Sequence, residues 1–546
     1  MKANRLLPAL AAAMMSSVAL APTASFAATC ESLINAHVAN TTITAAQSIF
    51  AGAYVAPDGT NVGNMPAFCR VAATVSTQPT EAVKIEIWMP ASDWNGKYEA
   101  QGSGGFGGSI SYAALAAPVN AGFAAATTDT GHEGGTIGAI GAPLPWAQNP
   151  VSLYDWGHTS IHLMTVAAKD IIKQFYKKDI RYSYYAGCST GGAEAMEEAE
   201  YYPEDFDGLW AGSPGMDYAH LMESFLWGGL PSAQNPAALV PQSTLNALNT
   251  AVLNACTSAK ALVTDTFLND PRDCHFDPSA LLCTAGQSSG TCLTAPQLAA
   301  VKHLYSPVTN PRTGLKLYPG FAPGSESQWA LIQGSLIAFF AQPLLANTVF
   351  NNPNWDWTTF NYDSDAKRVD QVLSPKIDAT SPNLSRLREL GHKLIMTQGW
   401  IDALNAQSLP IEYYNNVVLS NDSGNIHKTA DYFRLFMVPG MSHCGGGPGP
   451  NNFDAVAALE KWVEQRAEPD TLLATAYKNG DPSQGVAMTR PLCPYPKVVK
   501  YQAGNPTQAA SFTCVNDADD YAKDRAQEVK NLLQNLVVGD RQNLPN

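Results

Sequence analysis

A serine, an aspartate and a histidine occur in this sequence at positions that suit nucleophilic catalysis. The stretch GCSTG fits G-x-S-x-G, the pattern of a sharp strand-to-helix turn that exposes a nucleophilic serine, here Ser189. A serine needs a base to attack near neutral pH, and the base needs an acid that fixes its tautomer. Asp402 and His443 follow in the expected order, each just after a segment that reads as a strand, 393–397 and 433–438. We therefore predict the catalytic triad Ser189–Asp402–His443.

Backbone amides must also stabilise the negative charge that develops on the attacked carbonyl oxygen. One donor is expected to be the amide of Thr190, the residue after the nucleophile. The glycine-rich run QGSGGFGG at 101–108 is placed to supply the second, and we choose Gly104 over Gly105. Glycine suits this role because a backbone without side chains can approach a substrate closely. No G-K-[ST] follows the run, which argues against a nucleotide phosphate loop.

Other residues compete for the acid and base roles. Asp422 and Asp431 are alternative acids, but they lie in a polar loop or at a strand start, which favours Asp402. The competing histidines are His132, His158, His162 and His392. His158 and His162 could hold a metal on one helix face, yet the glutamate of H-E-x-x-H is missing between them. A zinc hydrolase is thus a minor alternative, and we predict no metal.

The N-terminal residues 1–27 read as a signal peptide. A basic start is followed by an apolar run and by the small-x-small cleavage site SFA. No later segment is apolar enough to span a bilayer, so we expect a secreted or periplasmic protein without a membrane partner. The net charge of −14 argues against nucleic acid as a partner, because phosphates would be repelled. The sequence does not indicate the oligomeric state.

Export leads to an oxidising compartment, where ten cysteines favour five disulfides. Sequence does not determine their connectivity, but neighbours along the chain invite the pairs Cys30–Cys69, Cys256–Cys274, Cys283–Cys292 and Cys493–Cys514. Cys188 and Cys444 remain, one beside Ser189 and one beside His443. A bond between them would hold the two catalytic loops in register. The alternatives for Cys188 are a buried filler thiol and a nucleophile in its own right, and the even count argues against the nucleophile.

Strand-like and helix-like segments alternate through the first part of the chain. Residues 83–88 alternate at period two, 160–176 carry apolar residues at helical spacing, and a strand at 182–186 precedes a helix at 193–201. This alternation predicts an α/β fold with a mostly parallel sheet covered on both faces. We expect 28–215 and 371–546 to form the core, the latter with a C-terminal tail. Residues 216–370, which are poor in strand patterns, should form an inserted, mostly helical lid domain.

A serine and a histidine that each adjoin a cysteine, with the aspartate between them in sequence, resemble the tannase and feruloyl esterase family. This family includes mono(2-hydroxyethyl) terephthalate hydrolase. The resemblance covers nearly the whole mature chain and includes TDTGH at 128–132, YPEDFDG at 202–208, RLFMVPGM at 434–441, HCGGG at 443–447 and LCPYP at 492–496. It implies an α/β-hydrolase core with a lid domain, the triad named above and the Cys188–Cys444 disulfide.

The chain departs from this family at a calcium loop. The family usually carries C-D-x-x-D-G-x-x-D-G in the lid, but residues 256–265 read CTSAKALVTD. Lysine and threonine replace two carboxylates, and only Asp265 remains. Calcium prefers several oxygen ligands, so we expect the site to be lost and predict no cofactor. The Cys256–Cys274 bridge would then be left to order the loop.

The lid is expected to supply an aromatic pocket for the acyl group, from Trp329, Phe339, Phe340, Phe350, Trp355, Trp357 and Phe360. No arginine lies between Arg312 and Arg368 to pair with the free carboxylate of a terephthalate monoester. We predict a secreted serine carboxylic ester hydrolase whose small substrates are aromatic esters of the gallate or hydroxycinnamate type. The alternatives are a hydrolase of phthalate-type or terephthalate-type monoesters and a non-catalytic exported binding protein on the same scaffold.

Overall fold

The computed structural model describes residues 29–78, 80–260, 265–287 and 290–516. The expected signal peptide at 1–27 and nearly all of the C-terminal tail lie outside these residues. Within the described part of the chain, no helix is both long and apolar enough to cross a membrane.

A nine-stranded sheet forms the centre of the molecule, in the order β1-β4-β5-β7-β6-β8-β9-β12-β13. The strands are β1 (Thr41–Ile49), β4 (Phe68–Gln78), β5 (Glu81–Pro90), β6 (Lys97–Gln101), β7 (Ala124–Thr128), β8 (Tyr182–Cys188), β9 (Gly208–Gly212), β12 (Lys393–Gly399) and β13 (Phe433–Val438). From β7 to β13 all neighbours pair in parallel, whereas β1, β4, β5 and β7 pair antiparallel. The predicted parallel core is present. Strands β1, β4 and β5 extend it in antiparallel pairing, and of these three only the strand at 83–88, which lies within β5, was predicted from the sequence.

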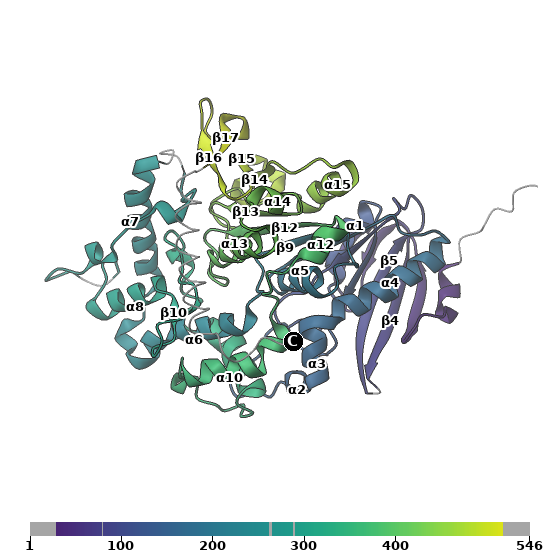
Figure 1. Cartoon of the computed structure of the whole chain (residues 1–546), viewed down its shortest axis with the longest axis horizontal. Helices are drawn as coiled ribbons and strands as arrows, with labels where there is room; N and C mark the ends of the chain where they lie inside the picture. The colour runs from purple at the N-terminus through teal and green to yellow at the C-terminus, as the bar shows by residue number, and fades with distance from the viewer. Residues whose placement is uncertain (1–28, 79, 261–264, 288–289, 517–546) are drawn as a thin grey trace, which may run out of the picture.

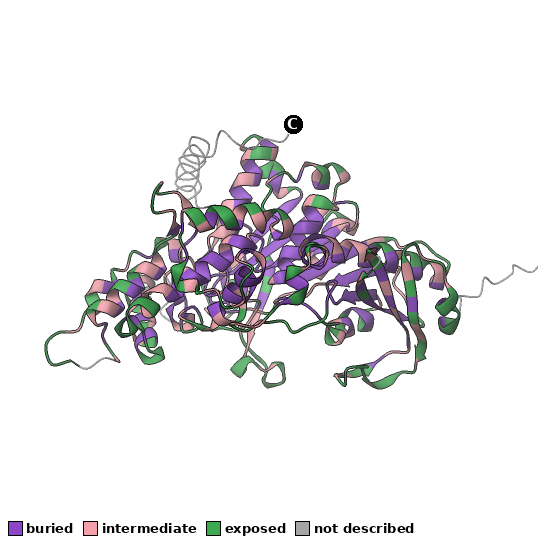
Figure 2. Cartoon of the chain, turned by 90° about the horizontal axis from the view of Figure 1, so that it is seen from below, coloured by how far each residue is buried: buried purple, intermediate pink, exposed green. Residues whose placement is uncertain are grey.

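Helices cover both faces of the parallel part, as strand β12 illustrates. Its successive side chains point to opposite faces. Leu394 and Met396 belong to the apolar cluster that includes α4 (Ser160–Tyr176) and α5 (Thr190–Tyr201). Ile395 belongs instead to the cluster around α15 (Ala455–Gln465). A strand buried on both faces reads as a continuous apolar run, and Figure 2 shows such buried residues gathered in the central sheet and its helices.

The segment predicted as a lid consists largely of helices. Its main ones are α6 (Tyr218–Gln234), α7 (Gln242–Lys260), α8 (Ala295–Tyr305), α9 (Gln342–Thr348) and α10 (Ser364–Val372), beside a short hairpin of β10 (Val308–Thr309) and β11 (Lys316–Tyr318). Figure 1 shows α6, α7 and α8, in teal, on the opposite side of the parallel strands from β4 and β5. The segment shares one apolar cluster with Phe106 and Trp146 of the core. The domain limits 216 and 370 themselves stay a prediction.

Two hairpins follow the last strand of the sheet, β14 (Leu472–Tyr477) with β15 (Val486–Leu492) and β16 (Lys497–Tyr501) with β17 (Phe512–Asn516).

All ten cysteines are paired as predicted: Cys30–Cys69, Cys188–Cys444, Cys256–Cys274, Cys283–Cys292 and Cys493–Cys514. The predicted pairing is therefore confirmed, which excludes Cys188 as a free thiol nucleophile.

Candidate active site

Ser189 lies between the end of β8 and the start of α5, in the strand–turn–helix context that the sequence predicted. Its backbone adopts φ 65° and ψ −119°, a conformation that non-glycine residues rarely adopt. The Ser189 amide donates to the carbonyl of Gly212 at the end of β9 (2.9 Å), and its own carbonyl accepts from Gly215 (3.2 Å). The surrounding backbone thus holds the serine in a strained turn, as a nucleophile elbow requires.

The glycines around this serine are needed for close backbone packing. A Cβ atom at Gly187 would lie 2.4 Å from the Gly191 carbonyl oxygen, and one at Gly192 would lie 2.4 Å from that of Gly212. These positions therefore exclude any larger residue. The helix α5 begins at Thr190, three residues before the predicted start at 193. The prediction placed the start too late because Gly191 and Gly192 are poor helix formers.

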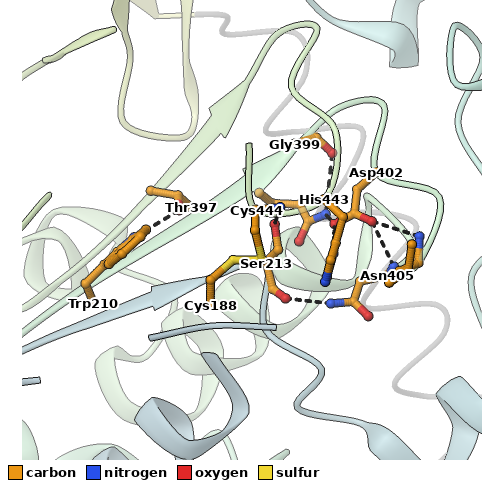
Figure 3. Close-up of a disulfide and its surroundings, with 11 residues drawn as sticks. Cys188, Trp210, Ser213, Thr397, Gly399, Asp402, Asn405, His443 and Cys444 are labelled. Atoms are coloured by element: carbon orange, nitrogen blue, oxygen red, sulfur yellow. Dashed lines mark hydrogen bonds and ion pairs between the residues drawn. A yellow bond between two sulfur atoms is a disulfide. The ribbon is translucent and has the colours of Figure 1, made fainter. Parts of the chain in front are cut away.

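Asp402 and His443 lie in adjacent loops after β12 and β13, and they meet. The His443 Nδ1–H donates to Asp402 Oδ2 (2.9 Å), and Asp402 is fully buried (Figure 3). Its oxygens also accept hydrogen bonds from the amides of Leu404 (2.8 Å) and Asn405 (3.1 Å) and from Gln398 Nε2 (3.0 Å). These donors fix the carboxylate, which in turn fixes the imidazole ring and its tautomer.

This arrangement leaves His443 Nε2 as the free nitrogen of the ring. Nε2 is buried and makes no hydrogen bond with any residue that the structure describes. Burial lowers the pKa of His443, but the charge of Asp402 and the hydrogen bond to it outweigh burial, so the pKa is raised above its ordinary value. A histidine in this state is a competent base that accepts a proton at Nε2.

A cavity of about 340 Å³ brings the predicted site residues together. Ser189, His443, Thr190 and Gly104 all line it. The full lining is Gly104, Gly105, Thr136, Ile137, Ser189, Thr190, Gly215, Tyr218, Leu221, Met222, Phe225, Phe340, Leu404, Asn405 and His443. Serine, base and both predicted oxyanion donors thus share one concave, largely apolar site, while Asp402 supports it from beneath the surface.

The aromatic residues expected around the acyl group mostly lie elsewhere. Of the seven, Phe340 alone is among the lining residues that the structure describes. Trp329 is fully buried. Phe350 and Trp355 are half-buried, stack with ring centroids 3.9 Å apart and pack against the apolar cluster of the segment. Tyr218, Leu221, Met222 and Phe225 of α6 form the wall instead. Sequence reasoning missed them, although their spacing of i, i+3, i+4 and i+7 on one helix face was the available signal.

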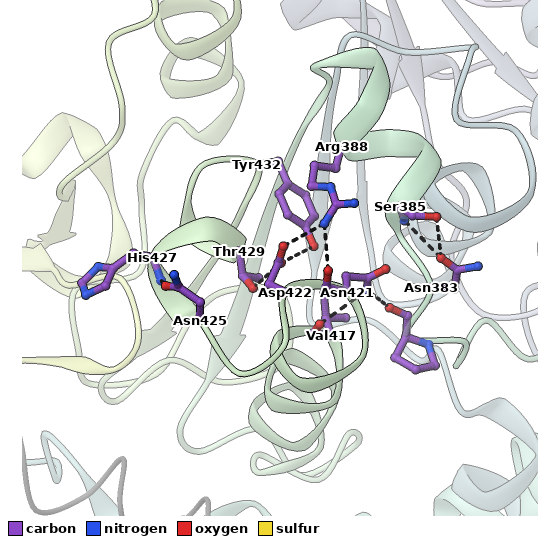
Figure 4. A network of polar contacts seen from close by, with 11 residues as sticks. Asn383, Ser385, Arg388, Val417, Asn421, Asp422, Asn425, His427, Thr429 and Tyr432 are labelled. Atoms are coloured by element: carbon purple, nitrogen blue, oxygen red, sulfur yellow. Dashed lines mark hydrogen bonds and ion pairs between the residues drawn. The ribbon is translucent and has the colours of Figure 1, made fainter.

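The alternative acids are engaged in other interactions. Asp422 is buried and pairs with Arg388 (Oδ1 to Nη1, 2.8 Å), and it accepts hydrogen bonds from Thr429 Oγ1 (2.7 Å) and Tyr432 OH (3.0 Å) (Figure 4). Asp431 is exposed. Neither is bonded to His443, whose carboxylate partner in the described residues is Asp402.

The two histidines considered as metal ligands pair with carboxylates. His158 Nδ1 lies 2.6 Å from Glu197 Oε2, and His162 Nδ1 lies 2.6 Å from Asp205 Oδ2. The two rings therefore pair with different carboxylates. Across the described residues no cluster of three or more His, Cys, Asp or Glu side chains is placed to hold a metal ion.

Asp265, the carboxylate left from the calcium loop, pairs with an arginine. Arg490 Nη2 lies 3.0 Å from Asp265 Oδ1, and Nη1 lies 3.1 Å from Oδ2, with both side chains fully buried. The guanidinium already supplies the positive charge that this carboxylate needs. Residues 261–264 lie outside the described part of the chain. A cation bonded to both oxygens of Asp265 does not fit a calcium site.

Comparison with known proteins agrees with this geometry. The family model "Tannase and feruloyl esterase" matches residues 69–515. An uncharacterized esterase of Xanthomonas campestris pv. campestris is 36% identical, over 91% of this chain and 93% of its own. A probable feruloyl esterase B-1 of Aspergillus flavus is 30% identical, over 82% and 86%. The crystal structure of feruloyl esterase B from Aspergillus oryzae superposes with a TM-score of 0.81 at 28% identity, covering 89% of this chain and 99% of that one. The chain therefore belongs to the tannase and feruloyl esterase family and is a carboxylic ester hydrolase with an α/β-hydrolase fold.

Proposed function

We propose that this chain is a secreted serine esterase that cleaves small esters of aromatic acids, of the hydroxycinnamate or gallate type, through an acyl-enzyme. The observation that carries the proposal is the shared cavity. The proposal is supported by the residues that line it: Ser189 with its strained backbone, His443 with its bond to the buried Asp402, and the apolar side chains of the wall.

The mechanism follows from the tautomer of His443. With its Nδ1–H bonded to Asp402, the ring accepts the Ser189 hydroxyl proton at Nε2 as Oγ attacks the ester carbonyl. The amides of Thr190 and Gly104 would hold the oxyanion of the tetrahedral intermediate. His443 then protonates the departing alcohol, which leaves the acyl group on Ser189. Water, deprotonated by His443, attacks this ester, and His443 returns the proton to Ser189 Oγ as the bond to the acyl group breaks and the acid is released.

The cavity wall supports aromatic and uncharged acyl groups. Phe225 and Phe340, whose ring centroids lie 6.4 Å apart, line the cavity together with Leu221 and Met222, so burial of a phenyl ring is favourable. No arginine or lysine is among the described residues that line the cavity. An acyl group with a free carboxylate would bury its charge unpaired, at a cost of several kcal/mol.

This wall speaks against the terephthalate-type alternative more than against a cinnamoyl or galloyl ester. Cinnamoyl groups are the better match, because the three hydroxyls of a galloyl group would find few hydrogen-bond partners beside Leu221, Met222, Phe225 and Phe340. The remaining alternative, a non-catalytic binding protein, has no use for a serine, histidine and aspartate held in this way.

The experiment is labelling by an aryl phosphonate, followed by mapping of the modified peptide. We expect one phosphonyl group on Ser189, because an activated serine attacks phosphorus irreversibly. The Ser189→Ala variant should stay unlabelled. An unlabelled wild type would favour the binding protein, and label on another residue would overturn the proposed nucleophile.

A further inference from the structure

Glu194 is a buried carboxylate on α5 that faces the glycine-rich loop rather than a cation. Only 3% of the residue is exposed. Its Oε2 accepts the amide of Ser103 (2.8 Å), and its Oε1 accepts the Ser103 hydroxyl (2.5 Å). The Tyr185 hydroxyl lies 2.7 Å from Oε2 and 2.9 Å from the Gly191 carbonyl, so it can donate to either. Both carboxylate oxygens thus accept hydrogen bonds from Ser103, the residue that precedes Gly104.

The loop that Glu194 holds is bonded to α5 at further points. We call residues 102–105 the amide loop, because Gly104 is the predicted second oxyanion donor. The Gly191 amide donates to the carbonyl of Ser103 (2.9 Å), and Thr190 Oγ1 donates to that of Gly105 (2.7 Å). The amide loop is therefore fixed on the first turns of the same helix that begins beside Ser189.

Packing at this contact leaves the loop little freedom to shift. A Cβ atom at Gly102 would lie 2.4 Å from the Tyr185 hydroxyl and 2.7 Å from Gly191 Cα. The backbone of the amide loop therefore rests directly on the helix. Movement away from α5 is opposed chiefly by the hydrogen bonds, and Ser103 makes two of them to Glu194 alone.

We propose that Glu194 is a positioning residue that sets the Gly104 amide at the distance from Ser189 that the oxyanion requires. The inference rests on the proposed function, since it assumes that Ser189 is the nucleophile. An oxyanion donor stabilises the transition state only where it meets the developing charge, and a displacement of about 1 Å costs roughly 100-fold in rate. Glu194 would act through Ser103, without touching substrate.

The hydrogen-bond pattern predicts which substitution is tolerated. In Glu194→Gln the amide oxygen at the Oε2 position can still accept the Ser103 amide, and the new NH2 group can donate to the Ser103 hydroxyl. Glu194→Ala removes both interactions and leaves the Ser103 amide without an acceptor. The glutamine variant should therefore rescue most of what alanine loses.

The same helix offers a matched control. Glu198 is equally buried, at 1% exposure, and it has no hydrogen bond to the amide loop in the described structure. Glu198→Ala removes a buried carboxylate from α5 without changing the contacts of Ser103. It should alter the melting temperature but leave kcat within about twofold of wild type.

The test compares kcat, KM and the affinity for an aryl trifluoromethyl ketone, which forms a tetrahedral adduct, in full-length proteins. For Glu194→Ala we expect kcat to fall roughly 10- to 100-fold, while KM stays within about threefold of wild type. The affinity for the ketone should fall by about the same factor as kcat. Glu194→Gln should stay within about fivefold of wild type. If Glu194→Ala does not fold, Ser103→Ala, which removes the hydroxyl contact alone, should still lower kcat about fivefold.

Unchanged kcat in Glu194→Ala, or in Ser103→Ala where the former does not fold, would overturn the inference. So would a fall in kcat that the ketone affinity does not follow, or an equal fall in Glu198→Ala. Ser189→Ala separates this failure from that of the proposed function. If it is inactive while Glu194→Ala is fully active, only the positioning role is wrong. If it remains active, the nucleophile itself is wrong.

Discussion

Cys188 and Cys444 form a disulfide with Cα atoms 5.9 Å apart, although 256 residues separate them in the chain. One immediately precedes Ser189 and the other immediately follows His443. The bond, drawn in Figure 3, therefore ties the elbow after β8 to the loop after β13.

Removal of this disulfide should lower both activity and stability. In the double variant Cys188→Ala with Cys444→Ala we expect kcat to fall roughly 10- to 100-fold, because the two catalytic loops lose their shared tether. The free energy of unfolding should fall by about 4 kcal/mol, since the bond closes a very long loop. Ester hydrolysis and urea denaturation measure the two effects.

The control is the bridge between Cys283 and Cys292, which closes a short loop, and none of the described residues of this loop lines the cavity. Its double alanine variant should lose about 2 kcal/mol or more and keep its kcat. A Cys188/Cys444 variant with full kcat would show that the tether does not position the catalytic groups.

Activity should depend on the protonation of His443. The neutral ring is the base, so kcat/KM should fall tenfold per pH unit below the pKa of His443. Asp402 holds that pKa above the ordinary value of 6.5. The raised pKa therefore moves the acid limb of the kcat/KM–pH profile to higher pH.

Asp402→Asn should reverse this shift. Burial, which lowers the pKa of His443, would then dominate, and the acid limb should move to lower pH while kcat falls by about 10⁴. A pH–rate profile of the residual activity measures both. An acid limb that stays in place in the variant would contradict the role assigned to Asp402.

The apolar wall should control affinity for the acyl group. Phe340→Ala is expected to lower kcat/KM for methyl ferulate about 10- to 100-fold, because a ring contact in the cavity is lost. Phe339 is its matched control, since it is the neighbouring residue and is 42% exposed. Phe339→Ala should change kcat/KM less than about twofold. Equal effects of the two substitutions would place the acyl group elsewhere.

The buried ion pair of Asp265 and Arg490 should be a structural requirement. Arg490→Met leaves the Asp265 carboxylate buried without its partner, so we expect a loss of about 3–5 kcal/mol in the free energy of unfolding. Arg312→Ala, which breaks an exposed pair with Asp363, should cost less than about 1 kcal/mol. Urea denaturation distinguishes them, and equal losses would contradict the account.

Calcium should have no effect on the protein. Because Arg490 already neutralises Asp265, neither a chelator nor millimolar Ca²⁺ is expected to shift the melting temperature. Differential scanning calorimetry with and without chelator checks this. A rise of several degrees on addition of Ca²⁺ would show that a calcium site persists.

The parallel core and the disulfides were predictable from sequence because their signals are local or countable. Each of β8, β12 and β13 is a short apolar run followed by a chemically distinctive loop, and the even number of cysteines limits the pairings. The edge strand β1 was not recognised, since TTITAAQSI is only partly buried and lacks a clear alternation. Its place is set by pairing with β4.

The site was predictable in its reacting residues but not in its walls. Ser189, Asp402 and His443 were predicted from motif and order; Ser189 and His443 line the same cavity, and His443 is bonded to Asp402. Phe225 and Phe340 come from segments far apart in sequence, and only their meeting in three dimensions separates them from core residues such as Trp329. Glu194 gives no signal in sequence, because nothing local distinguishes it from the other buried glutamates of α5.

The central claim is that Ser189 is the nucleophile of an esterase for aromatic acids. The direct measurement is acid release from methyl ferulate, methyl gallate, chlorogenate and mono(2-hydroxyethyl) terephthalate by wild type and by Ser189→Ala. We predict turnover of the uncharged esters by wild type, highest for the hydroxycinnamates, and a loss of at least about 10³-fold in the variant. Equal activity in the two proteins would contradict the mechanism, and a preference for the terephthalate monoester would contradict the proposed substrate class.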